Sequence, residues 1–302
     1  MTNRARIRAV LLVATLVVAL AGCGESTVQR PAPPQPLKVM TFNVECSFCP
    51  NVYPWATRLG YFGDIFARHD PDLIGLQELS PPPFNNGKEV EQVLAHAPGY
   101  SAVFYGSDTS LPYPDATILY RSSRFTVLEH GAYWLSPTPD VPLSMGFATP
   151  QLARLVVWAR LLDTVRDREL YFATTHFDNN SPSQAMSAPL VQARAAPFVE
   201  QLPVIVVGDF NSRPDSTAYR ILTSDSSHGF VFENAFDLTS WHIVTNQTPE
   251  PAYDVNDRID HIFLAGSAVH WSVSSWAADL TVYGAQQSYP SDHFPIVAEV
   301  DY

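Results

Sequence analysis

Two short segments in the C-terminal third of the chain join an apolar run to polar residues that could carry out acid–base chemistry. The run 203–207 leads into Asp209 and Asn211, and Asp292 with His293 comes directly before the run 294–300. An acid beside an amide and an acid beside an imidazole can hold a hydrated divalent ion against a phosphate and deprotonate a water molecule. These pairs therefore indicate metal-assisted hydrolysis.

Other polar residues lie at the edges of further apolar runs, and they are Asn43, Gln77 with Glu78, His176, and Asp260 with His261. Taken alone, a polar residue in such a place is more often a hydrogen-bonded structural residue than a catalytic one. Six such sites in one chain are much less expected by chance. We therefore predict that they meet in a single pocket.

The segments that carry these residues resemble the endonuclease/exonuclease/phosphatase superfamily, which has a DNase I-like fold. The resemblance extends from Leu37 to Val300 and rests on six segments: Thr41–Asn43, Pro71–Glu78, Thr175–Asp178, Gly208–Asn211, Arg258–His261 and Ser291–Pro295. The stretch 133–140, with Arg154 and Trp158, is similar to the secreted or uncharacterised bacterial branch of that superfamily.

The resemblance implies a metal site. Glu78 would be the main ligand of Mg²⁺, or of Mn²⁺ or Ca²⁺, since hard cations prefer carboxylate oxygen. Asn43 would hold the metal or its water molecules, and Asp292 would lie in the metal region. The ion would polarise the phosphoryl group.

The resemblance also implies catalytic roles for five further residues. Asp209 and Asn211 would orient the attacking water and the phosphate oxygens. His293 would act as general acid or base, with Asp260 holding its imidazole in the required tautomer. His176 would bind a phosphate oxygen.

The roles of several other residues stay open at this point. Arg154 could clamp the substrate phosphate or pair with a surface acid. Asp178 could bind substrate, or it could form a polar turn with residues 179–180. Glu45 could be a second acid near the metal, whereas His261 is expected to be structural because it points away from Asp260. Aromatic side chains are expected in the core rather than at a substrate platform at Tyr133, Trp134, Trp158 and Trp241.

The N-terminus has the features of a secretory signal. Arg4, Arg6 and Arg8 precede an apolar stretch over 9–22, which is too short for a comfortable membrane span. Leu20–Cys23 resembles the lipobox of bacterial lipoproteins, so we expect 1–22 to be a signal peptide and Cys23 to carry lipid. The proline-rich segment 23–36 is then a stiff tether to the membrane, and the protein is expected to be extracytoplasmic.

Charge bears on the choice of substrate. Loss of residues 1–22 removes three arginines and no acid, which takes the formal charge from −12 to −15. Proteins that grip duplex nucleic acid usually carry a basic stripe, and this chain has none. A small or lipid-borne phosphoester is therefore favoured. The alternatives are a secreted nuclease and a non-catalytic lipoprotein that binds phosphate or metal, and a monomer is expected in each case.

Cys46 and Cys49 form a single Cys-x-x-Cys motif. In an oxidising compartment a local disulfide is favoured over a redox motif, and a zinc ribbon would need a second pair of cysteines.

Many strands with few helices predict an α+β fold, and no linker follows Pro36, so 37–302 is expected to be one catalytic domain. The resemblance makes this a four-layer sandwich of two mostly antiparallel sheets flanked by helices. Helices are expected over 58–69 and 184–194, the second partly broken by Pro189. Strands are expected over 37–43, 71–76, 100–105, 116–120, 125–130, 155–161, 169–175, 204–207, 259–264 and 294–300.

Overall fold

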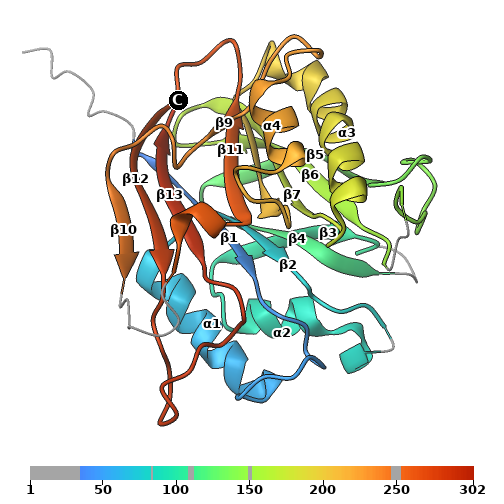
Figure 1. Ribbon diagram of the computed structural model, residues 1–302. Coiled ribbons are helices and arrows are strands. Elements are labelled where there is room, and N and C mark those ends of the chain that lie inside the picture. Colours follow the sequence, from blue (N-terminus) through green and yellow to red (C-terminus); the bar gives the residue numbers. More distant parts are fainter. Residues whose placement is uncertain (1–34, 83, 108–111, 149–151, 246–252) are drawn as a thin grey trace, which may run out of the picture. The chain divides into compact units, whose positions relative to one another are not determined.

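Two β-sheets packed face to face form the centre of the molecule (Figure 1). The seven-stranded sheet has the order β10 (His242–Thr245), β12 (Ser272–Asp279), β13 (Ile296–Asp301), β1 (Leu37–Asn43), β2 (Leu73–Gln77), β4 (Tyr113–Arg121) and β3 (Tyr100–Tyr105). The six-stranded sheet has the order β5 (Phe125–Trp134), β6 (Leu155–Asp163), β7 (Arg168–His176), β8 (Val204–Asp209), β11 (Asp260–Ala265) and β9 (Glu233–Asn234). Neighbouring strands are antiparallel except in the pairs β1–β2, β7–β8 and β10–β12.

This computed structural model describes residues 35–302 apart from 83, 108–111, 149–151 and 246–252. The described residues belong to one compact unit, Pro34–Tyr302. Cys23, the signal peptide and nearly all of the tether lie outside the described residues, so the lipid anchor stays a prediction. No helix in the described part is long and apolar enough to cross a membrane.

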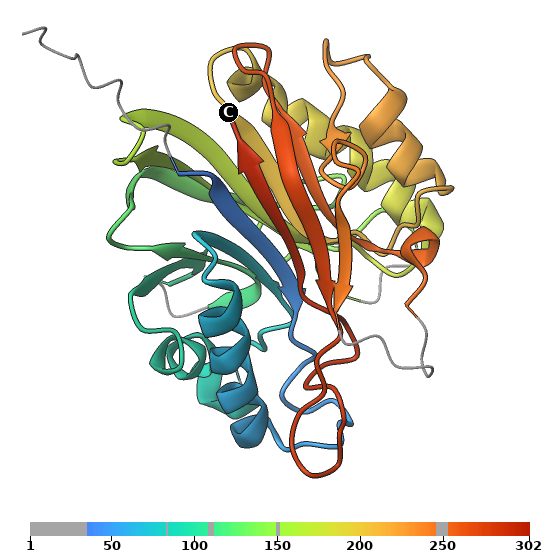
Figure 2. The same cartoon turned by 90° about the vertical axis from the view of Figure 1, so that its left-hand side faces the viewer.

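Helices cover the outer face of each sheet, as the two views in Figures 1 and 2 show. Helices α1 (Trp55–His69) and α2 (Glu89–Ala95) pack on the seven-stranded sheet, and α3 (Ser181–Val199) and α4 (Thr217–Ser224) pack on the six-stranded sheet. Two short 3₁₀ helices, η1 (Phe84–Gly87) and η2 (Val255–Asp257), lie in loops. The predicted four-layer α+β sandwich is confirmed.

Side-chain alternation along the strands explains this layering. In β1, Val39 faces the second sheet, whereas Met40 and Phe42 face α1. Both faces of the strand are buried, which accounts for its nearly continuous apolar sequence.

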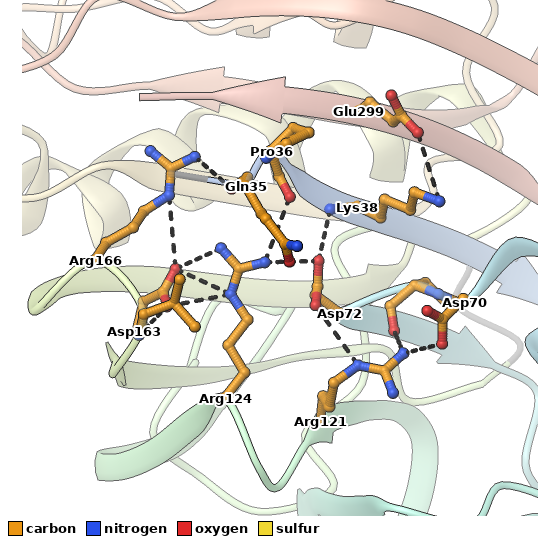
Figure 3. A network of polar contacts seen from close by, with 12 residues as sticks. Gln35, Pro36, Lys38, Asp70, Asp72, Arg121, Arg124, Asp163, Arg166 and Glu299 are labelled. Atoms are coloured by element: carbon orange, nitrogen blue, oxygen red, sulfur yellow. Dashed lines mark hydrogen bonds and ion pairs between the residues drawn. The ribbon is translucent and has the colours of Figure 1, made fainter. Parts of the chain in front are cut away.

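Charged residues at the start of β1 fix this strand in place (Figure 3). Asp72 accepts hydrogen bonds from the backbone N–H of Lys38 at 2.9 Å and from Nη1 of Arg124 at 2.9 Å. The Nη2 of Arg124 also pairs with Asp163 of the six-stranded sheet at 2.7 Å. The network therefore ties the two sheets together at the end of β1 opposite to Asn43.

The structure corrects the prediction for the helix over 184–194. Helix α3 runs unbroken from Ser181 to Val199 and contains Pro189. Asn180 caps its first turn, and its buried face packs on the six-stranded sheet. This packing outweighs the cost of about 3 kcal/mol for a proline inside a helix. Two helices, α2 and α4, and three strands, β9, β10 and β12, were not predicted from the sequence.

Candidate active site

The strand register brings the polar residues to one edge of the two sheets. Within the six-stranded sheet, Asp209 is the pairing partner of both His176 and Asp260. In the seven-stranded sheet, Asn43 ends β1 and Glu78 follows β2. The Nδ2 of Asn43 donates to Oε1 of Glu78 at 3.0 Å and to Oδ2 of Asp209 at 3.1 Å, which joins the two sheets.

His293 enters the site from the loop before β13. Ser291 positions this loop, because its Oγ donates to the carbonyl of Asn43 at 2.7 Å and accepts from the backbone N–H of His293 at 3.1 Å. The Nδ1 of His293 lies 2.9 Å from Oδ2 of Asp260. A carboxylate can only accept, so Nδ1 carries a proton and Nε2 is left facing Oδ2 of Asp209 at 3.6 Å.

Burial opposes the charged form of both members of this pair. It raises the pKa of Asp260. For His293, burial would lower the pKa, but the charge and hydrogen bond of Asp260 outweigh it and raise the pKa to about 10. The charge of Asp260 therefore favours the imidazolium form of His293, which can donate a hydrogen bond from Nε2.

His176 is held by Arg154, which in turn pairs with Asp115, an acid that was not predicted from the sequence. The Nη1 of Arg154 lies 2.7 Å from Nδ1 of His176 and 3.2 Å from Oδ2 of Asp115. Arginine has no acceptor, so Nδ1 accepts this hydrogen bond and Nε2 carries the proton, 3.4 Å from Oδ2 of Asp209. Burial would raise the pKa of Asp115, but the charge of Arg154 outweighs it and lowers the pKa to about 2. Arg154 thus pairs with a buried acid, rather than with the surface acid considered from sequence.

The loop after β1 places further carboxylates beside Glu78. The Oε2 of Glu78 accepts from the backbone N–H of Cys46 at 3.0 Å. Burial raises the pKa of Glu45, and the charges of Asp292 and Glu78 add to this effect. Arg58 lies 3.7 Å from Glu45, but its guanidinium also donates to the carbonyls of residues 44–46.

These groups fit a divalent cation. Glu45, Glu78 and Asp292 supply three carboxyl groups against one arginine, and oxygen donors suit Mg²⁺, Mn²⁺ or Ca²⁺. Ligand atoms of Asp209, Asp260 and His293 also lie within 4.8 Å of one another, but a protonated His293 has no lone pair for a metal, so this cluster suits proton transfer better. The buried Oδ1 of Asp260 has no hydrogen-bond partner in the described structure. Asp292 itself is exposed. The cluster of Cys46, Cys49 and Glu78 is a poorer choice because the two cysteines form a disulfide.

The backbone is unusual at several of these positions. Glu45, Glu78 and Asn211 have φ values of 54°, 70° and 48°, in the left-handed region that few residues other than glycine adopt. Asn211 is held there because its backbone N–H donates to Oδ1 of Asp209 at 2.8 Å and its Nδ2 donates to the carbonyl of Phe177 at 3.0 Å. Such backbone conformations often occur at functional sites.

Other residues that were considered from sequence have structural hydrogen bonds or lie in solvent. Asp178 accepts from Nδ2 of Asn180 at 2.6 Å, which favours the polar-turn alternative, although its buried Oδ2 has no partner in the described structure. His261 is structural as predicted, since it is buried between Asn234 and the carbonyl of Ser212. The core prediction was wrong for Trp241, which is 66% exposed next to the edge strand β10.

Comparisons with known proteins bear on this arrangement. Residues 40–293 match the Endonuclease/Exonuclease/phosphatase family. The CCR4-Not complex 3'-5'-exoribonuclease subunit Ccr4 of Emericella nidulans is 24% identical over 199 residues, which are 57% of this chain and 28% of that protein. Protein angel of Drosophila melanogaster is 26% identical over 160 residues, 51% of this chain and 42% of that protein. The chain thus spans less than half the length of these curated relatives.

Solved structures with a similar fold cover almost all of the described chain. A mannosyl-6-phosphatase of Bacteroides thetaiotaomicron superposes with a TM-score of 0.74 at 25% identity, over 88% of this chain and 100% of that one. The human Nocturnin catalytic domain with a bound sulfate anion has a TM-score of 0.62 at 19% identity, over 88% and 93%. The second comparison supports the fold alone.

Proposed function

Because the chain belongs to the Endonuclease/Exonuclease/phosphatase family, whose members hydrolyse phosphoester bonds, we propose that it is a divalent-metal-dependent phosphoesterase. One observation carries the proposal. Asp209 lies at the meeting point of both sheets, with Nδ2 of Asn43 and Nε2 of His176 and His293 within 3.6 Å of its Oδ2. A carboxylate among three N–H groups can accept a proton while its neighbours hold anionic oxygens.

In the proposed reaction, Asp209 orients a water molecule and accepts its proton as the oxygen attacks phosphorus. The N–H groups of His176 and His293 bind the phosphoryl oxygens and stabilise the charge that develops on them. The bond from phosphorus to the alcohol oxygen breaks, and the alcohol leaves with a proton from His293 or solvent. Asp260 keeps the His293 ring oriented through Nδ1, and Arg154 does the same for His176.

Glu78 and Asn43 would hold the divalent cation, with Glu45 and Asp292 adding negative charge nearby. When bound, the cation would polarise the phosphoryl group. Asn43 links this position to Asp209, so the ion-binding groups and the proton acceptor keep a fixed relation.

The test uses purified mature protein and a small phosphoester with Mg²⁺. Asp209→Asn and His293→Gln should each lower kcat by about 1,000-fold, in the middle of the usual range for loss of an acid–base group. Asp257→Asn and His130→Gln alter exposed residues of the same types and should leave kcat unchanged. Full activity in both site variants would reject the proposal.

For the substrate, we favour a small or lipid-borne phosphoester over nucleic acid. The formal charge is −12 and lysine occurs only at positions 38 and 88. A structural neighbour of 25% identity is a mannosyl-6-phosphatase, which acts on a small phosphate ester. A nuclease would instead lose activity steeply as salt is raised, and a lipid phosphoesterase would depend on the amount of vesicle surface.

We also propose that the mature protein is a monomer anchored outside the cytoplasm through lipid on Cys23. The basic start, the short apolar stretch and Leu20–Cys23 support this proposal. The full-length chain should sediment with membranes and carry a lipid mass, and Cys23→Ser should lose both. Equal sedimentation of the two forms would exclude the anchor.

A further inference from the structure

A pocket of about 330 Å³ adjoins the candidate site on the side of Glu78 and Arg154. The charged residues Glu78, Asp115 and Arg154 lie on the side of the pocket that adjoins the candidate site, since Glu78 contacts Asn43 and Arg154 contacts His176. The rest of its wall is mainly apolar and includes Phe48, Phe84, Leu79, Pro81, Leu152 and the Cys46–Cys49 disulfide. The volume lies within the range of small-molecule sites, about 300–1,000 Å³.

Two exposed phenylalanines form one wall of this pocket. The rings of Phe48 and Phe84 stack with their centroids 4.1 Å apart and their planes at 22°. Phe48 is 59% exposed and Phe84 is 43% exposed, although most large apolar side chains in the described chain are buried. An exposed apolar surface beside a reaction site indicates contact with a ligand.

The loop that carries Phe48 and the loop that carries Phe84 are each fixed by covalent or hydrogen bonds to the rest of the fold. The disulfide closes the loop around Phe48, and Arg58 donates to the carbonyls of residues 44–46. On the other side, the backbone N–H of Ser80 donates to Glu89 at 2.7 Å, and Asn85 donates to Gln92 at 2.7 Å. The apolar wall is therefore formed before a ligand arrives, which lowers the entropic cost of binding.

The chemistry of the pocket limits what it can bind. Arg154 is the one cationic residue among its described lining residues, and it is already paired with Asp115. A negatively charged group on the organic part of the substrate would therefore be repelled by Glu78 and Asp115. A sugar needs many hydrogen-bonding partners. The apolar part of the wall offers few, since the Oγ of Ser80 is buried and the hydroxyl of Tyr113 is bonded to the carbonyl of Ala153.

Building on the proposed function, we propose that this pocket binds the organic group attached to the substrate phosphate, and that this group is an uncharged aryl or compact alkyl group. The phosphate lies at the charged end, beside Glu78, and the organic group lies against Phe48 and Phe84. The phosphoesterase would then prefer apolar esters over phosphosugars and polynucleotides.

The test compares phenylphosphonate with methylphosphonate, which have one organic group each and are not hydrolysed. In the presence of Mg²⁺, calorimetry on the mature wild-type protein should show phenylphosphonate binding at least tenfold more tightly. Phe48→Ala and Phe84→Ala should each remove most of this preference and leave the affinity for methylphosphonate unchanged. Trp241→Ala, which removes an exposed aromatic side chain outside the pocket, should keep the wild-type preference.

Equal affinity for the two phosphonates in the wild type, or a preference that survives both phenylalanine substitutions, would overturn the inference. Failure of this inference can be distinguished from failure of the proposed function. If wild-type protein shows no preference for the phenyl group but hydrolyses phosphoesters in a reaction that depends on His293, the inference about the pocket is rejected and the proposed function stands. A phenyl preference that depends on Phe48, in a protein that hydrolyses no phosphoester, would reject the enzyme and keep the pocket.

Discussion

Asp115→Asn should destabilise the fold because it leaves the Arg154 guanidinium without its buried counter-charge. Asp115 and Arg154 lie 3.2 Å apart, and each side chain is 11% exposed. The pKa of Asp115 falls from 3.8 to about 2, which corresponds to roughly 2 kcal/mol of stabilisation at neutral pH. The unpaired arginine adds to the loss, so we expect a total of about 3 kcal/mol, at the lower end for a broken buried pair.

Urea unfolding at pH 7 measures this change, and the melting temperature should fall by roughly 6–10 °C. A double-mutant cycle with Arg154→Met isolates the interaction, and a coupling energy of about 2 kcal/mol is expected between the two positions. The exposed pair Arg213–Asp257 is the control, and Asp257→Asn should leave the unfolding midpoint unchanged.

The effect must also depend on pH with a definite sign. The folded-state pKa of Asp115 is depressed, so its contribution is complete above the unfolded pKa of about 3.9 and is lost as the pH falls through about 2. Wild type and Asp115→Asn should therefore converge in stability at the acid end. Additive single and double variants, or a stability difference that is the same at pH 7 and at pH 2, would refute the reasoning.

Three further predictions follow from other parts of the chain. Burial would raise the pKa of Asp279, but hydrogen bonds to His69 and Thr281 and the charge of Arg68 outweigh it and hold the pKa below its usual range. The contribution of Asp279 to stability is therefore lost on acidification, and Asp279→Asn should flatten the acid limb of a pH-stability curve measured in urea. Replacing both Cys46 and Cys49 by serine should cost about 2 kcal/mol or less in urea unfolding, because the closed loop is short. Mg²⁺ at 100 times its Kd should stabilise the wild type by about 2.7 kcal/mol in a thermal melt, and Glu78→Ala should remove most of this gain.

Most of the site could be predicted from sequence because its residues lie where apolar runs end. A polar residue at the end of a buried strand, such as Asp209, can be recognised from the sequence alone, and six such places suggest a common edge. Asp115 was missed for the opposite reason. It lies inside β4, and only the position of Arg154, directly before β6, shows that this acid has a partner.

The fold elements that escaped prediction depend on tertiary packing. Helix α3 continues through Pro189 because its buried face is held on the six-stranded sheet, which local propensity does not reveal. Strand β12 mixes small polar and apolar residues without regular alternation, and its strand conformation depends on pairing with β13 and β10. Trp241 shows the limit of assigning residues to the core by type, since an edge strand leaves it in solvent.

The active site is formed by pairing between strands rather than by spacing within any one segment. The pairing of β8 with β7 on one side and β11 on the other fixes the position of Asp209, and Asn43 of the other sheet donates a hydrogen bond to it. A shift of one residue between β8 and β11 would turn the Asp260 side chain to the opposite face and remove the partner of His293. On the other side of β8, Gly208 permits the pairing with β7, because a Cβ there would lie 2.1 Å from the carbonyl oxygen of Thr175. The β7–β8 contact that holds His176 against Asp209 therefore requires glycine at this position.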